Sequence, residues 1–288
     1  MKIPINIPDI DDEEIRAVRH VLSEKSLTSS SFDGGVHVQQ FEKLVSKFVK
    51  SKFTIAVNSG TSALQASLYA LDIKSGDEVL VPSFTFVATA NSVKAVGAKP
   101  VFVDITRENY TMDPYDLRKK VTKRTKAIIP VHLYGHVAYM EEIIEVAKKN
   151  NLKIIEDASQ SLGSKFKQKH SGTFSHLGCF SFYGTKVTTS GEGGAVVTDN
   201  KILCEKLKQI RNHGQTKNNL VTRLGLNLRL SEINAAIAKI QMKKLPSFLK
   251  QRKNNAKILT ELLQNCDVVL PKQRKHETLN WYLYTIAH

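Results

Sequence analysis

Short apolar segments recur along the first two thirds of this chain, and most of them are separated by segments with helical periodicity. The apolar segments lie at 54–57, 78–82, 100–104, 126–132, 153–156, 179–182 and 195–198. Strands that alternate with helices pair mainly in parallel and are covered on both faces. The order therefore predicts an α/β protein with a mainly parallel sheet flanked by helices, and ligands of such sheets bind at the carboxyl ends of the strands.

Helical patterns also occupy the two flanks of this region. Apolar residues recur at helical spacing over 10–22, and Ser231 is placed to cap another helix late in the chain. Pro246 is expected to interrupt that helix or to begin a new one, because proline lacks a backbone N–H. Beyond Pro271, only residues 281–287 are typical of a strand.

A single lysine, Lys186, lies among small residues between the last two predicted strands. Glycines there let the backbone approach a ligand, and hydroxyls can bind a phosphate. These residues are Gly184, Gly191, Gly193 and Gly194, with Ser181, Thr185, Thr188, Thr189 and Ser190. A lysine held in such a loop can form a Schiff base with a carbonyl cofactor. The alternative is a surface hairpin that carries a solvated lysine.

Small polar residues follow the strand at 54–57 and lead directly into a helical segment. A helix that starts in this way presents free backbone N–H groups at the positive end of its dipole, and these groups bind anions. We assign Gly60, Thr61 and Ser62 to a phosphate group. The alternative is an ordinary helix N-cap.

Asp157 follows the strand at 153–156 and is expected at the same edge of the sheet. A carboxylate in this position can face the ring nitrogen of a pyridine cofactor and keep it protonated. The alternative is the N-cap of a helix that would begin at residues 157–160.

The cysteines and two of the histidines give no indication of a metal site. Cys179, Cys204 and Cys266 are widely spaced and odd in number, so we expect reduced, buried thiols and no bound metal. His132 and His213 stand near predicted strand or loop ends. Single histidines of this kind are more often structural, and we leave both outside the catalytic set.

The formal charge of +15 is concentrated late in the chain, where residues 201–288 carry 17 Lys and Arg against 5 Asp and Glu. A basic end can indicate nucleic acid binding. However, these charges follow amphipathic helices without interleaved aromatic residues, so we expect a solvated helical face and no nucleic acid partner. The absence of an eighteen-residue apolar stretch and of a signal peptide predicts a cytoplasmic protein that does not bind membranes.

Together these motifs resemble the nucleotide-sugar aminotransferases of the DegT/DnrJ/StrS type, which are pyridoxal phosphate enzymes of fold type I. The resemblance runs from Ile3 to about Leu245 in one register. It implies that Gly60, Thr61, Ser62 and Ser181 hold the cofactor phosphate, with Lys186 as the lysine that binds the cofactor covalently. It also implies that Phe86 stacks on the cofactor ring, that Asp157 faces the ring nitrogen and that Gln160 lies near the ring hydroxyl. Asn227 would complete the phosphate site of a neighbouring subunit, which predicts a homodimer with shared active sites.

The resemblance implies transfer of an amino group, with glutamate as the expected donor, to a keto-sugar nucleotide in surface polysaccharide or amino-sugar biosynthesis. Relatives that act as dehydratases have histidine in place of the lysine, and this chain keeps Lys186. Two alternatives remain: a catalytically silent cofactor-binding or regulatory protein, and another fold type I lyase or dehydratase.

The end of the chain departs from the family pattern. The family's small C-terminal domain normally continues well beyond the position of His288, where this chain stops. We therefore expect a large cofactor-binding α/β domain over 1–245 and the start of an incomplete, small C-terminal α/β domain over 246–288. Residues that bind the substrate are expected to be missing from it.

Overall fold

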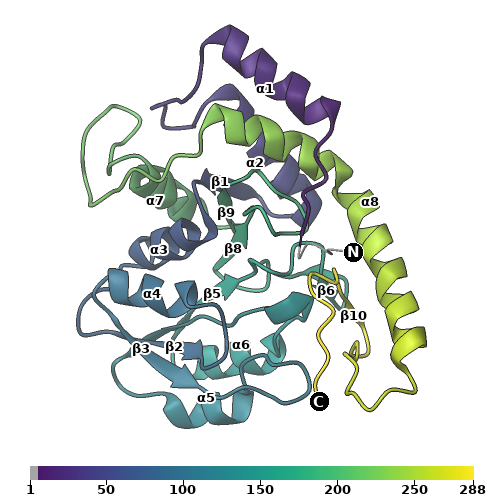
Figure 1. Ribbon diagram of the computed structural model, residues 1–288. Coiled ribbons are helices and arrows are strands. Elements are labelled where there is room, and N and C mark those ends of the chain that lie inside the picture. The colour runs from purple at the N-terminus through teal and green to yellow at the C-terminus, as the bar shows by residue number, and fades with distance from the viewer. Residues whose placement is uncertain (1–5) are drawn as a thin grey trace.

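A seven-stranded sheet forms the centre of the computed structural model, which describes residues 6–288 (Figure 1). Its strand order is β1-β9-β8-β5-β4-β2-β3. The strands are β1 (Phe53–Val57), β2 (Glu78–Pro82), β3 (Lys99–Val103), β4 (Thr125–Ile128), β5 (Lys153–Asp157), β8 (Leu177–Ser181) and β9 (Gly194–Thr198). Pairing is parallel from β8 to β3, and β9 runs antiparallel to both of its neighbours. The predicted α/β class with a mainly parallel sheet is confirmed.

Helices cover both faces of the sheet because successive strand residues point to opposite sides. Side chains such as Ile55 and Cys179 pack beneath α3, α4 and α7, whereas their neighbours Ala56 and Phe180 pack beneath α2 and α8. A third cluster packs α5 and α6 against β2 and β4. The helices are α1 (Asp12–Glu24), α2 (Val36–Val49), α3 (Gly60–Ala70), α4 (Ala88–Ala95), α5 (Pro114–Lys120), α6 (Met140–Lys149), α7 (Lys201–Arg211) and α8 (Glu232–Leu263).

The expectation that Pro246 ends or begins a helix is wrong. Helix α8 starts at its Ser231 cap and continues through Pro246 to Leu263. The missing N–H of Pro246 removes the bond to the Met242 carbonyl. Packing compensates for this loss, since Met242 and Leu245 on the same turn are buried against α2 and the sheet.

The strand expected at 281–287 is also absent from the described residues. Trp281 has a left-handed φ of 52°, and the segment's only ladder contact among the described residues is an isolated bridge between Val269 and Ala287. Backbone pairing occurs just before it, where β10 (Glu277–Thr278) joins β6 (Lys165–Phe166), which in turn pairs with β7 (Lys169–His170). The apolar alternation therefore predicted a strand where the backbone turns at Trp281 and pairs with no neighbouring strand of the described structure.

The cysteines agree with their prediction in part. Cys179 and Cys204 are buried, and burial raises the pKa of both thiols. Cys266 is exposed, so the expectation of a buried thiol is wrong there. It lies in the irregular segment after α8, where no second layer covers the chain.

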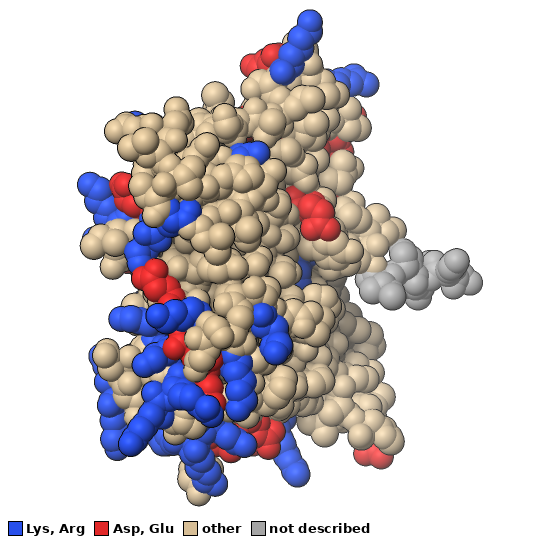
Figure 2. Space-filling model, turned by 90° about the vertical axis from the view of Figure 1, so that its left-hand side faces the viewer, with Lys and Arg blue, Asp and Glu red and all other residues tan. Residues whose placement is uncertain are grey.

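Basic side chains gather on the lower part of the face shown in Figure 2, around the region where Figure 1 places α5 and β3. The exposed residues of this stretch include Lys119, Lys120, Lys123 and Arg124. Within the described range, no helix is both long and apolar enough to cross a membrane. Ile3, where the resemblance begins, and the rest of residues 1–5 lie outside that range.

Candidate functional site

A cavity of about 350 Å³ opens at the carboxyl ends of the central strands. Its walls come from the start of α3, the loop after β2, the end of β5 and the segment between β8 and β9. All of the predicted site residues except Ser62 and Asn227 line it, namely Gly60, Thr61, Phe86, Asp157, Gln160, Ser181 and Lys186. Motifs that lie far apart in the sequence therefore meet in one place, as the parallel topology requires.

The start of α3 forms one end of this cavity. Ser59 is the N-cap, and its Oγ accepts the Ser62 N–H at 3.0 Å. The Gly60 and Thr61 N–H groups bond to none of the described residues, so they remain available to an anion at the positive end of the helix. A methyl group on Gly60 would lie 2.8 Å from the Ser181 Cβ, which shows how closely the helix start and β8 approach.

Ser62 does not contribute to this surface. Its hydroxyl donates to the Asn58 Oδ1 at 2.6 Å, and its N–H is used by the Ser59 cap. The cap alternative is therefore correct for Ser59, and only the N–H groups of Gly60 and Thr61, between the cap and Ser62, remain available to an anion.

Asp157 is the last residue of β5, and its side chain is held by hydrogen bonds on both oxygens. The Thr89 hydroxyl donates to Oδ2 at 2.9 Å, and the Ser159 N–H donates to Oδ1 at 3.2 Å. No helix begins at 157–160 in the described structure, where the chain makes a turn, so the N-cap alternative is wrong. The carboxylate is 6% exposed and lines the cavity, a position from which it can face a cationic ring nitrogen.

Lys186 lies on the segment between β8 and β9 and is half-buried, so the surface-hairpin alternative is wrong. Its Nζ lies 3.4 Å from the Tyr282 Oη and 4.7 Å from the centre of the Tyr282 ring. A primary amine in this position can react with a carbonyl compound in the cavity.

Only some of the nearby hydroxyls face the cavity. Ser181 and Thr185 line it, whereas Thr188, Thr189 and Ser190 are buried elsewhere in the same segment. The Thr189 Oγ1 donates to the Phe182 carbonyl, and the Ser190 Oγ donates to the Glu192 carbonyl. The expectation that these three could bind a phosphate is wrong, because the Thr189 and Ser190 hydroxyls bond within the turn and the Thr188 hydroxyl is buried away from the cavity without a hydrogen-bond partner.

Gln160 and Phe86 occupy two further sides of the cavity. The Gln160 Oε1 accepts the Tyr134 N–H at 2.9 Å, which leaves its amide N–H groups available to a ligand. Phe86 comes from the loop after β2 and is 68% exposed, so its ring is accessible for stacking.

Asn227 lies apart from the cavity of its own chain. Its side chain is exposed, and its carbonyl accepts a 3.4 Å hydrogen bond from Asn58 beside the start of α3. The prediction that Asn227 serves a neighbouring subunit concerns a second chain and stays a prediction.

His132 has a structural role, as expected. Its Nδ1 accepts the Ala138 N–H at 3.0 Å, so its Nε2 carries the proton and donates to Glu156 at 2.9 Å. Both side chains are fully buried. Among the described residues, no cluster of three or more His, Cys, Asp or Glu could hold a metal ion.

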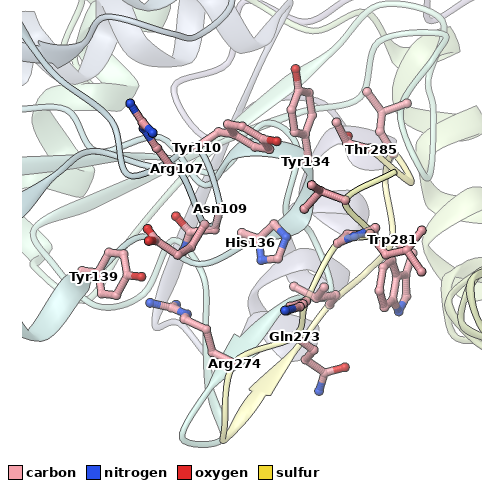
Figure 3. A pocket seen from close by; sticks show the side chains of 17 residues that line it. Arg107, Asn109, Tyr110, Tyr134, His136, Tyr139, Gln273, Arg274, Trp281 and Thr285 are labelled. Carbon is pink, nitrogen blue, oxygen red and sulfur yellow. The ribbon is translucent and has the colours of Figure 1, made fainter. Parts of the chain in front are cut away.

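A second cavity, of about 480 Å³, lies beside the first, and Figure 3 shows its lining. Trp281 and Thr285 stand on one side of this view, Tyr139 and Arg274 on the other, with His136 between them. Arg274 is already paired with the buried Glu277. This cavity is the larger of the two, but none of the predicted residues lines it. Lys186 and Asp157 line the smaller cavity, which is therefore the candidate site.

The residues that sequence reasoning missed are those that depend on tertiary contacts. Thr89 orients Asp157 from α4, Tyr134 holds Gln160, and Tyr282 contacts Lys186 from the far end of the chain. No local pattern marks a threonine or tyrosine for such a task. Tyr282 lies in the segment that was expected to be a strand. The alternating pattern could assign its side chain to one face of that strand, but it could not predict the contact with Lys186.

Comparisons with known proteins agree on one family. The family model described as DegT/DnrJ/EryC1/StrS aminotransferase family matches residues 8–288. GDP-perosamine synthase of Escherichia coli O157:H7 is 36% identical over 99% of this chain and 77% of its own length. The UDP-N-acetyl-3-dehydro-α-D-glucosamine 3-aminotransferase of Acidithiobacillus ferrooxidans is 40% identical over 86% of this chain and 68% of its own.

The fold is also similar to solved structures. The sugar aminotransferase Spr1654 from Streptococcus pneumoniae, in its PLP form, superposes with a TM-score of 0.93 at 27% identity. The match covers 99% of this chain and 78% of that one.

Proposed function

Because the chain belongs to the DegT/DnrJ/EryC1/StrS aminotransferase family, it is a pyridoxal phosphate-dependent aminotransferase, and we propose that it moves an amino group from glutamate to a keto-sugar carried by a nucleotide. The names of its relatives, which include a GDP-perosamine synthase and a UDP-sugar 3-aminotransferase, support a role in amino-sugar biosynthesis.

One observation carries the assignment of the site. The Lys186 amine, the Asp157 carboxylate and the free N–H groups of Gly60 and Thr61 line a single cavity. These groups match the aldehyde, the ring nitrogen and the phosphate of pyridoxal phosphate in chemical type. We assign Ser181 to the phosphate as well, since its side chain borders Gly60. Ser62 supports this end of the site through the Ser59 cap, and Asn227 is proposed to act across a dimer interface.

The residues divide the chemistry between them. Pyridoxal phosphate, when bound, draws electrons from the bond that breaks at the amino donor's Cα. Asp157 would keep the ring nitrogen protonated, because a buried carboxylate favours a positive charge beside it. Phe86 would stack on the ring, and Gln160 would donate its amide N–H to the ring hydroxyl. The Nζ of Lys186 would hold the cofactor through its carbonyl, and the same amine would take up the proton that leaves Cα of the amino donor.

The proposed function is tested by following 2-oxoglutarate formed from glutamate. We expect its formation to depend on added nucleotide-linked keto-sugar, offered as UDP-N-acetyl-3-dehydro-α-D-glucosamine and related sugars that carry other nucleotides. Lys186→Ala should lower the rate by a factor on the order of a thousand or more, since it removes both the covalent anchor and the proton carrier. Lys201→Ala, on the exposed start of α7, should keep the wild-type rate.

Other outcomes separate the alternatives. A lyase would consume its substrate without glutamate, and a silent protein would bind the cofactor without producing 2-oxoglutarate. Either result would contradict the proposal.

A further inference from the structure

Tyr282 is the only side chain of the described part of the molecule within hydrogen-bonding distance of the Lys186 amine. Its Oη lies 3.4 Å from Nζ, and its ring centre lies 4.7 Å away, which allows a cation–π contact when the amine is charged. Tyr282 also lines the cofactor cavity. The hydroxyl and the ring of Tyr282 thus both restrict the position of the Lys186 Nζ.

The segment that carries Tyr282 is fixed on both of its flanks. The guanidinium of Arg252, on α8, donates to the Trp281 and Tyr282 carbonyls at 3.1 Å each. The Asn280 Oδ1 accepts the Tyr282 N–H at 3.0 Å, and the Asn280 Nδ2 donates to the Gln160 carbonyl at 3.0 Å. The backbone that presents Tyr282 is therefore tied directly to a residue of the candidate site.

The Asn280 side chain also packs closely against the backbone of Gly135. A methyl group on Gly135 would lie 2.3 Å from the Asn280 Oδ1, so the loop after β4 accepts the Asn280 side chain only because a glycine stands there. The backbone here is not a regular strand, since Trp281 has a left-handed φ of 52°, and neighbouring side chains point into different cavities. Leu279, Trp281 and Leu283 line the larger cavity, and Tyr282 lines the smaller one.

We infer that Tyr282 is a positioning residue that holds the Lys186 amine toward the cofactor carbonyl, which makes the segment 279–283 part of the active site. The inference rests on the proposed function, because it takes Lys186 as the residue that binds the cofactor. A lysine side chain is among the most mobile, and restricting it in advance lowers the entropy lost when the amine reacts. Tyr282 therefore speeds covalent capture of the cofactor without contributing to phosphate binding.

The test measures capture in the absence of any sugar substrate. The full chain, freed of cofactor, is mixed with pyridoxal phosphate, reduced with borohydride after set times, and the mass gained by the Lys186 peptide is followed. We expect Tyr282→Phe, which keeps the ring, to be captured about threefold more slowly than wild type, and Tyr282→Leu at least tenfold more slowly. Tyr284→Phe is the matched control, since its hydroxyl bonds to Thr260, away from Lys186.

A second measurement separates positioning from a general loss of structure. Pyridoxamine phosphate has no carbonyl, so it reports cofactor binding without capture, and its Kd should stay within twofold of wild type in Tyr282→Phe. The inference is overturned by a wild-type capture rate in Tyr282→Phe, by equal slowing in Tyr284→Phe, or by weakened pyridoxamine phosphate binding that accounts for the slower capture. If wild-type protein is captured at another lysine, the assignment of Lys186 in the proposed function fails instead.

Discussion

At Gly60 the first turn of α3 lies close against the Ser181 side chain. We predict that Gly60→Ala weakens pyridoxal phosphate binding about tenfold or more, because the added methyl would displace Ser181 or the helix start from the phosphate position. The check is the Kd for pyridoxamine phosphate.

Gly184 provides the matched control for this substitution. A methyl group added there would meet no heavy atom within 4 Å, and the residue lies on the same segment as Lys186. Gly184→Ala should bind the cofactor as wild type does. Equal affinities in the two alanine variants would show that the α3 start does not hold the phosphate.

At the scale of single residues, the sequence was sufficient to predict the positions of side chains that lie at or just after the ends of strands. Asp157 and Lys186 could be predicted because parallel strands bring their carboxyl ends together, whatever the loops between them do. Ser62 was placed in the same site as Gly60, but its two polar groups are satisfied locally. Thr89 and Tyr282 could not be predicted, since their role depends on contacts with residues 68 and 96 positions away.

At the scale of elements, the short ribbon of β6 and β7 contains a histidine that should make stability depend on pH. The His170 Nδ1–H donates to the Ser171 carbonyl, and its Nε2 accepts the Gly163 N–H. Burial lowers the pKa of His170 to about 4, below the ordinary value of 6.5. The unfolded chain therefore binds a proton more readily than the folded one between these two values.

We predict that the free energy of unfolding falls as the pH is lowered from about 6.5 toward 4, by up to about 3 kcal/mol from this residue. Above pH 6.5 the residue is neutral in both states and contributes no slope. Urea unfolding at pH 7, 5.5 and 4.5 measures the effect, and His170→Gln should flatten the slope. His20→Gln, on the exposed side of α1, should keep the wild-type slope; a slope unchanged in His170→Gln would contradict the assignment.

Elements with a strong internal pattern were predictable, and those that depend on their neighbours were not. Each apolar segment of the first 200 residues became a strand of the sheet, and most of these strands are apolar throughout because helices cover both of their faces. Pro246 gave the wrong result because the packing of α8 outweighs one lost hydrogen bond. Residues 281–287 form only one isolated bridge in the described structure, and no local pattern reveals whether a partner strand is present.

At the scale of the whole molecule, exposed apolar side chains lie on the same loop as Asn227. Leu220, Val221 and Leu224 are 64%, 66% and 63% exposed. Such residues fit a subunit interface, which would place Asn227 at a partner's phosphate site. The predicted boundary after residue 245 and the dimer both remain predictions.

We predict that mixing Lys186→Ala with Asn227→Ala restores activity. In a heterodimer with shared sites, one site keeps both intact residues, so an equal mixture should reach about a quarter of the wild-type rate. A mixture of Lys186→Ala with Asp157→Asn is the control, and it should stay inactive because both residues serve the site of their own chain. Subunit exchange is verified by tagging one variant.

The shared-site proposal would be contradicted in two ways. Exchanged heterodimers of Lys186→Ala and Asn227→Ala could show no gain over the separate variants, or the active species could sediment as a monomer. In either case Asn227 would serve its own chain or none.

The pairing of β1 with β9 also determines when the enzyme can form during its synthesis. β1 contacts no other strand of the sheet, and the antiparallel β9 that completes it is made about 140 residues later. At typical translation speeds this delay is on the order of ten seconds, during which β1 and the following anion-binding turn lack their final support. Lys186 lies immediately before β9, so the reactive amine and the phosphate end of the cavity are assembled in the same late event.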